Sequence, residues 1–143
     1  MFGEPLTIED LRRRAEFRVP RMFYDYADSG SWTEGTYRDN EDAFQRLKIR
    51  QRVAVDIEHR SVKTKMLGRE VAMPVALAPV GLTGMQHPDG EIQAALAAQR
   101  FGVPFTLSTM SVCSIEAVAE ATHQPFWFQL YVMRDRGFVE DLI

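Results

Sequence analysis

Apolar and polar positions follow a helical period from residue 7 to about residue 46, and an extended pattern begins after that. We predict three helices in the first part. The first begins at Thr7, a hydroxyl residue suited to an N-cap, with acidic residues in its first turn. The second has Pro20 near its first turn and Gly30 beyond its end, and the third is capped by Thr33.

The second part alternates between short apolar runs and helical segments. We expect extended structure over "VKTKML" and "VAMPVALAPV", with a turn at "GRE" between them. The runs "PVALAP", "PFTLS" and "PFWFQLY" read as strands, and each precedes a helical segment: "GEIQAALAAQRFG", "SIEAVAEAT" and "DRGFVEDLI". Gly102 suits the position after the first of these helices. Apolar strands that alternate with helices indicate a parallel sheet covered on both faces.

Two architectures contain such βα repeats. A doubly wound sheet normally opens with a glycine-rich phosphate loop, whereas the first strand here leads into "PVGLTG". A (β/α)₈ TIM barrel takes about 250 residues and eight strands. We therefore predict an α/β fold of the barrel type, with a helical part over 1–48 and about three of the eight βα units over 49–143. The third strand is expected to leave an exposed parallel edge.

Composition adds limits rather than a function. Hydrophobic residues make up 45% and charged residues 26%, as in globular proteins, and the formal net charge of −3 gives no reason to expect nucleic acid. The single cysteine, Cys113, excludes an internal disulfide. No apolar run approaches the roughly 20 residues that span a bilayer, and the N-terminus lacks the order of a signal peptide. We expect a cytoplasmic protein and leave open a peripheral contact with the inner face of the plasma membrane.

Small or polar groups follow each predicted strand. The three strands end at Pro79-Val80-Gly81, at Ser108-Thr109 and at Gln129-Leu130-Tyr131. In a parallel βα array all these ends lie on one face, where the site is built. A glycine allows a ligand to approach the backbone, and the hydroxyl and amide groups donate or accept hydrogen bonds. This set suits a planar heterocycle with alternating donors and acceptors better than a phosphate or a metal.

Each of these side chains also has a purely structural interpretation. Ser108 can satisfy a loop, Gln129 can be a buried structural amide, and Tyr131 can pack in the core. Tyr26 lies with Tyr24 in an aromatic helix, where core packing is favoured. The three histidines show no metal-ligand spacing, so we predict no metal site.

The motifs, in order, resemble one family. The segments "YDYADSG", "MPVALAPVG", "HPDGE", "FTLSTMSVCSIE" and "FWFQLYVMRDRG" are similar to those of the FMN-dependent 2-hydroxy-acid dehydrogenases and oxidases. Within the family they look most like the bacterial L-lactate dehydrogenases. The resemblance covers about residues 6–143 and implies the N-terminal portion of a single TIM-barrel domain, with 1–48 as a helical cap and 49–143 as the first part of the barrel.

The resemblance implies a role in binding FMN for five residues. The backbone of Pro79, Val80 and Gly81 would line the flavin near its N5 atom. Ser108 and Gln129 would hydrogen-bond the pyrimidine edge of the isoalloxazine. These roles come from the family and match the planar heterocycle expected from the strand ends.

The resemblance also implies a substrate side. Tyr26 would bind the substrate carboxylate through its hydroxyl, and Tyr131 would contact the substrate and stabilise developing charge as a catalytic group. Met110 stands where glycolate oxidases carry a tryptophan, which favours a side chain larger than glycolate's, such as the methyl of L-lactate.

The implied reaction is oxidation of an L-2-hydroxy acid, L-lactate first, to a 2-keto acid with reduction of FMN. The family's histidine base, arginines and lysine come from later strands, and none of the histidines here takes the base position, so we expect these residues alone to be inactive. The implied partners are the 2-hydroxy acid, an electron acceptor such as a quinone or oxygen, and further copies in a homo-oligomer. The alternatives are a mandelate dehydrogenase, an oxidase, or a non-catalytic truncated subunit serving as an interaction module.

Overall fold

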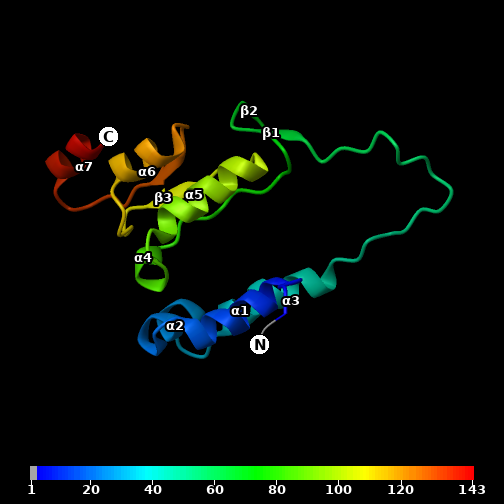
Figure 1. Cartoon of the computed structure of the whole chain (residues 1–143), viewed down its shortest axis with the longest axis horizontal. Coiled ribbons are helices and arrows are strands. Elements are labelled where there is room, and N and C mark those ends of the chain that lie inside the picture. Colours follow the sequence, from blue (N-terminus) through cyan, green and yellow to red (C-terminus); the bar gives the residue numbers. More distant parts are fainter. Residues whose placement is uncertain (1–2) are drawn as a thin grey trace. The chain divides into compact units, whose positions relative to one another are not determined.

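The structure, a computed structural model, describes residues 3–143, which divide into two compact units at residue 60. The first unit holds three helices: α1 (Ile8–Arg18), α2 (Arg21–Asp28) and α3 (Gly35–Arg46) (Figure 1). The second, Ser61–Ile143, is a mixed α/β unit. The division into a cap over 1–48 and a barrel part over 49–143 stays a prediction.

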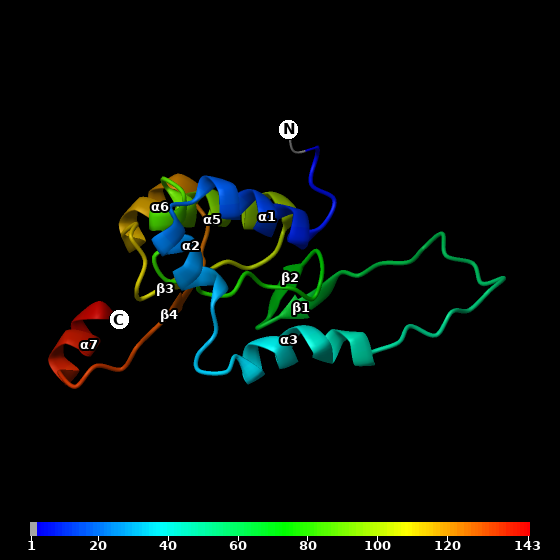
Figure 2. The same cartoon turned by 90° about the horizontal axis from the view of Figure 1, so that it is seen from below.

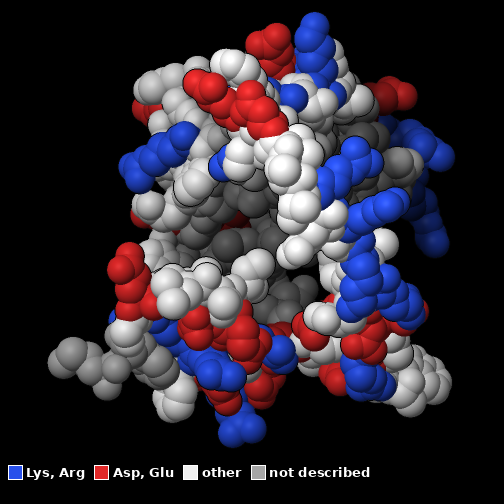
Figure 3. Space-filling view, turned by 90° about the vertical axis from the view of Figure 1, so that its right-hand side faces the viewer, with Lys and Arg blue, Asp and Glu red and all other residues white. Residues whose placement is uncertain are grey.

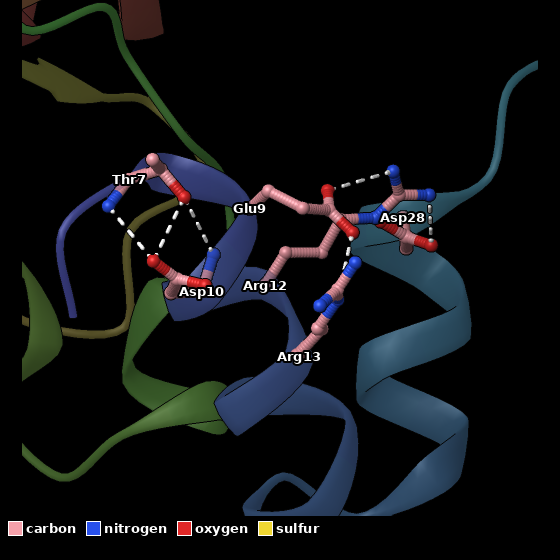
Figure 4. A network of polar contacts seen from close by, with 6 residues as sticks. All are labelled: Thr7, Glu9, Asp10, Arg12, Arg13 and Asp28. Atoms are coloured by element: carbon pink, nitrogen blue, oxygen red, sulfur yellow. Dashed lines mark hydrogen bonds and ion pairs between the residues drawn. The ribbon is translucent and has the colours of Figure 1, made fainter. Parts of the chain in front are cut away.

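The predicted helix starts are partly confirmed. Thr7 caps α1 as expected: its hydroxyl accepts from the Asp10 N–H at 3.2 Å, while the Asp10 carboxylate accepts from the Thr7 N–H at 3.0 Å (Figure 4). The predicted cap at Thr33 is wrong. Glu34 occupies the N-cap of α3 with a left-handed backbone, φ 58°, and its carboxylate accepts from the Gly30 N–H at 3.1 Å. That bond joins the residue before α3 to the loop that follows α2, and the helix starts one residue later than predicted.

An ion pair joins α1 to α2. Arg12 Nε lies 2.7 Å from Asp28 Oδ1, and Arg12 Nη2 donates to Asp28 Oδ2 at 2.9 Å (Figure 4). Two parallel bonds of this kind fix the geometry of a guanidinium and a carboxylate. None of the three helices contains a buried residue, and the Arg12–Asp28 pair is a polar contact between two of them.

A hairpin opens the second unit. Strands β1 (Thr64–Met66) and β2 (Arg69–Val71) pair antiparallel, with Met66 opposite Arg69. The turn is Leu67–Gly68, with φ 47° and 80°, and not the predicted "GRE". Two residues at positive φ match the twist of a tight hairpin, and this leaves the last two residues of "GRE" in the second strand.

The parallel sheet is shorter than predicted. Strand β3 (Thr106–Ser108) runs parallel to β4 (Trp127–Gln129), but the first predicted strand is reduced to one parallel bridge between Leu77 and Phe105. The Leu77 N–H donates to Pro104 O at 2.8 Å and Leu77 O accepts from the Thr106 N–H at 3.2 Å. Proline has no N–H to donate, so Pro79 cannot make the next bond of the ladder, and on the other side of Leu77 the Val75 N–H donates to Met73 O at 2.8 Å instead.

Helices cover this sheet and form its core. Three helices occupy the predicted βα positions: α5 (Gly90–Phe101), α6 (Ile115–Thr122) and α7 (Arg136–Leu142). A short helix that was not predicted, α4 (Thr83–Gln86), precedes them. Helices α5 and α6 pack side by side (Figures 1 and 2). The core consists of Ala95 and Ala98 of α5, Val118 of α6, Leu107 of β3 and the neighbouring Phe105. Gly102 ends α5 at φ 69°, as predicted.

No closed barrel forms among residues 3–143, in which each sheet has two strands. No helix in this part of the chain is long and apolar enough to cross a membrane. Charged side chains of both signs are interspersed on the face shown in Figure 3.

Candidate functional site

The carboxyl ends of β3 and β4 bring two predicted site residues together. Ser108 and Gln129 are opposite each other in the parallel register, and the Ser108 hydroxyl donates to Gln129 Oε1 at 3.2 Å. The same hydroxyl accepts from the Met110 N–H at 3.1 Å. Ser108 is only 4% exposed. Its hydroxyl therefore orients the Gln129 amide and the backbone at Met110 together.

Thr109 links the same two strands one residue further. Its hydroxyl donates to the backbone carbonyl of Gln129 and accepts from the Tyr131 N–H at 3.1 Å. These bonds fix where the chain leaves β4. Sequence reasoning placed Thr109 at the strand end but gave it no function, because a threonine beside a polar strand end has no special signature.

Gly81 lies close to both Ser108 and Met110. A Cβ atom at Gly81 would stand 3.3 Å from Met110 Cβ and 3.9 Å from Ser108 Oγ. The Leu82 N–H donates to Met110 O at 2.9 Å, and the Thr83 hydroxyl donates to Val80 O at 3.0 Å. The loop after Leu77 and the loop after β3 thus touch through backbone, and a side chain at residue 81 would be crowded.

Two tyrosines present polar groups at the surface. Tyr131 follows β4 and is 49% exposed. Tyr26 is 62% exposed on α2, so it does not pack in a core of the first unit. Its helix is held by the Arg12–Asp28 pair. Because Tyr26 belongs to the other unit, its place beside Tyr131 stays a prediction.

A buried acid that no motif in the sequence indicates lies beside these residues. Glu91, in the first turn of α5, is 2% exposed, and its Oε1 accepts from the Gly84 N–H at 3.1 Å and from the Val112 N–H at 3.0 Å. Burial raises the pKa of Glu91, but the N–H donors, Val112 foremost, outweigh it, so the pKa lies below its ordinary value. An acid at a helix start normally faces solvent, so nothing in "HPDGE" indicated this role.

One further titratable side chain, Cys113, lies beside Glu91. The pKa of the Cys113 thiol is raised, first by burial and then by the neighbouring Glu91 carboxylate, so Cys113 stays protonated at neutral pH. Among residues 3–143, no three His, Cys, Asp or Glu side chains gather in a way that could hold a metal ion.

The sequence matches a described family and curated relatives. The profile of the family described as FMN-dependent dehydrogenase matches residues 15–143. The chain is 48% identical over 134 residues to an L-lactate dehydrogenase of Vibrio cholerae and 51% identical over 134 residues to one of Chromohalobacter salexigens. Both alignments cover 94% of this chain, and they cover 35% and 34% of the relatives. The chain thus spans about a third of the length of these relatives.

Solved structures agree with the fold. A soluble mutant of the membrane-associated (S)-mandelate dehydrogenase from Pseudomonas putida matches with a TM-score of 0.88 at 38% identity, over 94% of this chain and 38% of that chain. A mandelate oxidase matches with a TM-score of 0.88 at 36% identity, over 96% of this chain and 40% of that chain.

Proposed function

The chain belongs to the family of FMN-dependent dehydrogenases, and from this premise we propose that it is the N-terminal part of an enzyme that oxidises an L-2-hydroxy acid to a 2-keto acid. L-Lactate, with pyruvate as product, is the substrate we favour. The observation that carries the proposal is the joined Ser108–Gln129 pair beside Gly81, in a chain 48 to 51% identical to L-lactate dehydrogenases.

The strand ends fit one wall of an FMN site. Gly81 lacks the Cβ that would crowd Met110, so the segment that follows Leu77 can lie against the loop that follows β3. In the proposal a flat ring system lies against the backbone of Pro79, Val80 and Gly81. Ser108 and Gln129 supply a hydroxyl and an amide for the pyrimidine edge. FMN, when bound, supplies the two-electron acceptor for the alcohol. The role of this chain is to hold one face and one edge of that ring.

Tyrosine hydroxyls account for the substrate side of the proposal. Tyr26 binds the carboxylate of the 2-hydroxy acid, and Tyr131 contacts the substrate and stabilises charge that develops on its oxygen. Met110, 50% exposed beside Gly81, is a flexible apolar side chain that suits the methyl group of lactate. The exposure of both tyrosine side chains supports roles in ligand contact over core packing.

The complete reaction needs groups beyond these residues. The family's base, arginines and lysine have no counterpart at matching positions in residues 1–143, and we propose that the chain alone does not turn over. In the full protein the first part forms a cap and the second about three of eight βα units of a barrel. The acceptor is a quinone or oxygen, and the assembly is a homo-oligomer. Peripheral membrane contact is part of the proposal because a similar mandelate dehydrogenase is membrane-associated.

A second candidate is oxidation of mandelate, supported by the fold match to mandelate dehydrogenase and mandelate oxidase. Identity to those structures is 36 to 38%, against 48 to 51% for the lactate enzymes, so lactate is favoured. A non-catalytic interaction module is a third candidate, favoured if the sample carries no flavin and no complementing chain.

A visible spectrum tests the proposal. The purified protein is recorded anaerobically before and after L-lactate, with (S)-mandelate as the matched comparison. Bleaching of a yellow sample by L-lactate indicates an assembled lactate enzyme, and bleaching by mandelate alone indicates the second candidate. A colourless 143-residue chain that also stays colourless with its complementing chain and FMN contradicts the flavin site.

A further inference from the structure

Glu91 is a buried carboxylate that the proposed reaction does not use. It lies in the first turn of α5, yet 2% of it is exposed, whereas acids at helix starts are normally solvated. Burying a carboxylate is costly unless hydrogen bonds compensate it. No arginine, lysine or histidine pairs with Glu91 among residues 3–143, so backbone amides do the compensating.

The two amides come from two separate segments of the chain, α4 and the loop that follows β3. The Gly84 N–H, three residues after Gly81, and the Val112 N–H, two residues after Met110, both donate to Glu91 Oε1, at 3.1 and 3.0 Å. Through these two hydrogen bonds, Glu91 Oε1 therefore connects the segment that follows Leu77 to the loop that follows β3. These are the loops whose backbones meet at Gly81 and Met110.

The space around the carboxylate is filled. A Cβ atom on Gly84 would stand 2.7 Å from Val112 Cβ and 3.1 Å from Glu91 Oε2. Glu91 Oε2 is buried and, within the described part of the chain, meets no donor at hydrogen-bonding distance and angle. The two segments are thus close-packed around one charged group.

We propose that Glu91 is a positioning residue that holds the segment 81–86, which contains α4, and the loop 109–114 together and thereby sets the gap between Gly81 and Met110. That this gap is a wall of a flavin site rests on the proposed function, whereas the locking of the two loops does not. Glu91 touches no ligand in this proposal and acts only through the amides of Gly84 and Val112.

Amide hydrogen exchange of the 143-residue chain, followed by NMR, tests the lock. In Glu91→Ala we expect exchange at Gly84 and Val112 to accelerate at least about tenfold, as for a lost hydrogen bond of ~1.4 kcal/mol, while the α6 amides keep their protection. Glu91→Gln keeps one acceptor oxygen and should restore part of the protection. Glu116→Gln is the matched control, because Glu116 has the same place in the first turn of α6 and is exposed.

Three results would overturn the proposal. The first is unchanged exchange at Gly84 and Val112 in a folded Glu91→Ala chain. The second is loss of protection from exchange at only one of the two amides. The third is loss of protection at the α6 amides in both Glu91→Ala and Glu91→Gln, which would mean that Glu91 stabilises the fold in general. If L-lactate fails to bleach the flavin, the proposed function is contradicted, but the expected exchange rates at Gly84, Val112 and α6 do not change. The two failures are therefore distinguishable.

Discussion

The hydroxyl of Ser108 donates to the side-chain oxygen of Gln129 at 3.2 Å, across two parallel strands and 21 residues of sequence. The bond fixes which end of the amide faces Ser108, so the Nε2 donor of Gln129 is turned away from the serine. An amide oriented in this way presents a defined hydrogen-bond donor, as the proposed contact with a heterocycle requires.

Removing the Ser108 hydroxyl tests that relationship. Ser108→Ala leaves the Met110 N–H and Gln129 Oε1 without their partner in a partly buried setting, so we expect the free energy of unfolding to fall by about 1 kcal/mol. Urea unfolding measures the change. Ser29→Ala, at an exposed helix end of the first unit, should shift the midpoint little, and equal losses in both variants would contradict the prediction.

Gly81→Ala should crowd Met110 without unfolding the chain. The new Cβ would stand 3.3 Å from Met110 Cβ, a tight contact that a flexible methionine relieves by moving. We expect a thermal midpoint within a few degrees of wild type and weaker FMN binding by the complete enzyme, measured by quenching of flavin fluorescence. Adding Met110→Ala should recover part of the affinity, and no recovery would show that the crowding lies elsewhere.

Acid should destabilise the second unit through Glu91. The pKa of Glu91 is lowered in the folded chain, because donors led by the Val112 N–H outweigh burial. Its stabilising effect is therefore present above the ordinary glutamate pKa of about 4.3 and is lost as the pH falls through the lower folded value. Cys113, its titratable neighbour, is neutral throughout that range because its pKa is raised by burial and by Glu91.

Urea unfolding at a series of pH values measures this effect. The loss of stability below about pH 4.3 should be smaller in Glu91→Gln than in wild type. Glu120→Gln serves as the control, because Glu120 is an exposed glutamate of α6. An identical acid profile in wild type and Glu91→Gln would contradict the prediction.

The Arg12–Asp28 pair should stabilise α2 more than the Arg21–Asp25 pair does. The pair has two short bonds, and its side chains are 38% and 27% exposed. Arg21 and Asp25 make one contact of 3.4 Å, and their side chains are 92% and 59% exposed. We expect Asp28→Asn to cost up to about 1 kcal/mol and Asp25→Asn almost nothing. Thermal unfolding by circular dichroism at low and high salt compares them, and equal effects would sink the idea.

The free edge of β4 should promote self-association of the 143-residue chain. Within residues 3–143 β4 pairs only with β3, and an apolar groove runs beside it, lined by Ile115, Ala119, Phe126, Phe128, Leu130 and Leu142. An unpaired edge next to apolar surface favours association. Sedimentation should show larger species as concentration rises, and fewer with Leu130→Lys. A concentrated, monodisperse chain that melts cooperatively would refute this.

Local signals in the sequence determined the helices of the chain and much of its order. The cap at Thr7, the helix end at Gly102 and the alternation of strands with α5, α6 and α7 all follow from neighbouring residues, because caps and periodicity are local. The same logic placed Ser108 and Gln129 at strand ends, since parallel strands share one carboxyl edge.

Tertiary structure decided what local signals could not. Glu34 stands at the N-cap of α3 in place of Thr33, with its carboxylate bonded to the Gly30 N–H, and the first predicted strand is reduced to one bridge at Leu77. The role of Glu91 depends on amides 7 and 21 residues away that meet only after two loops fold together. Burial and long-range hydrogen bonds are properties of the packed chain, so an acid that reads as solvated in the sequence becomes the point where two loops join.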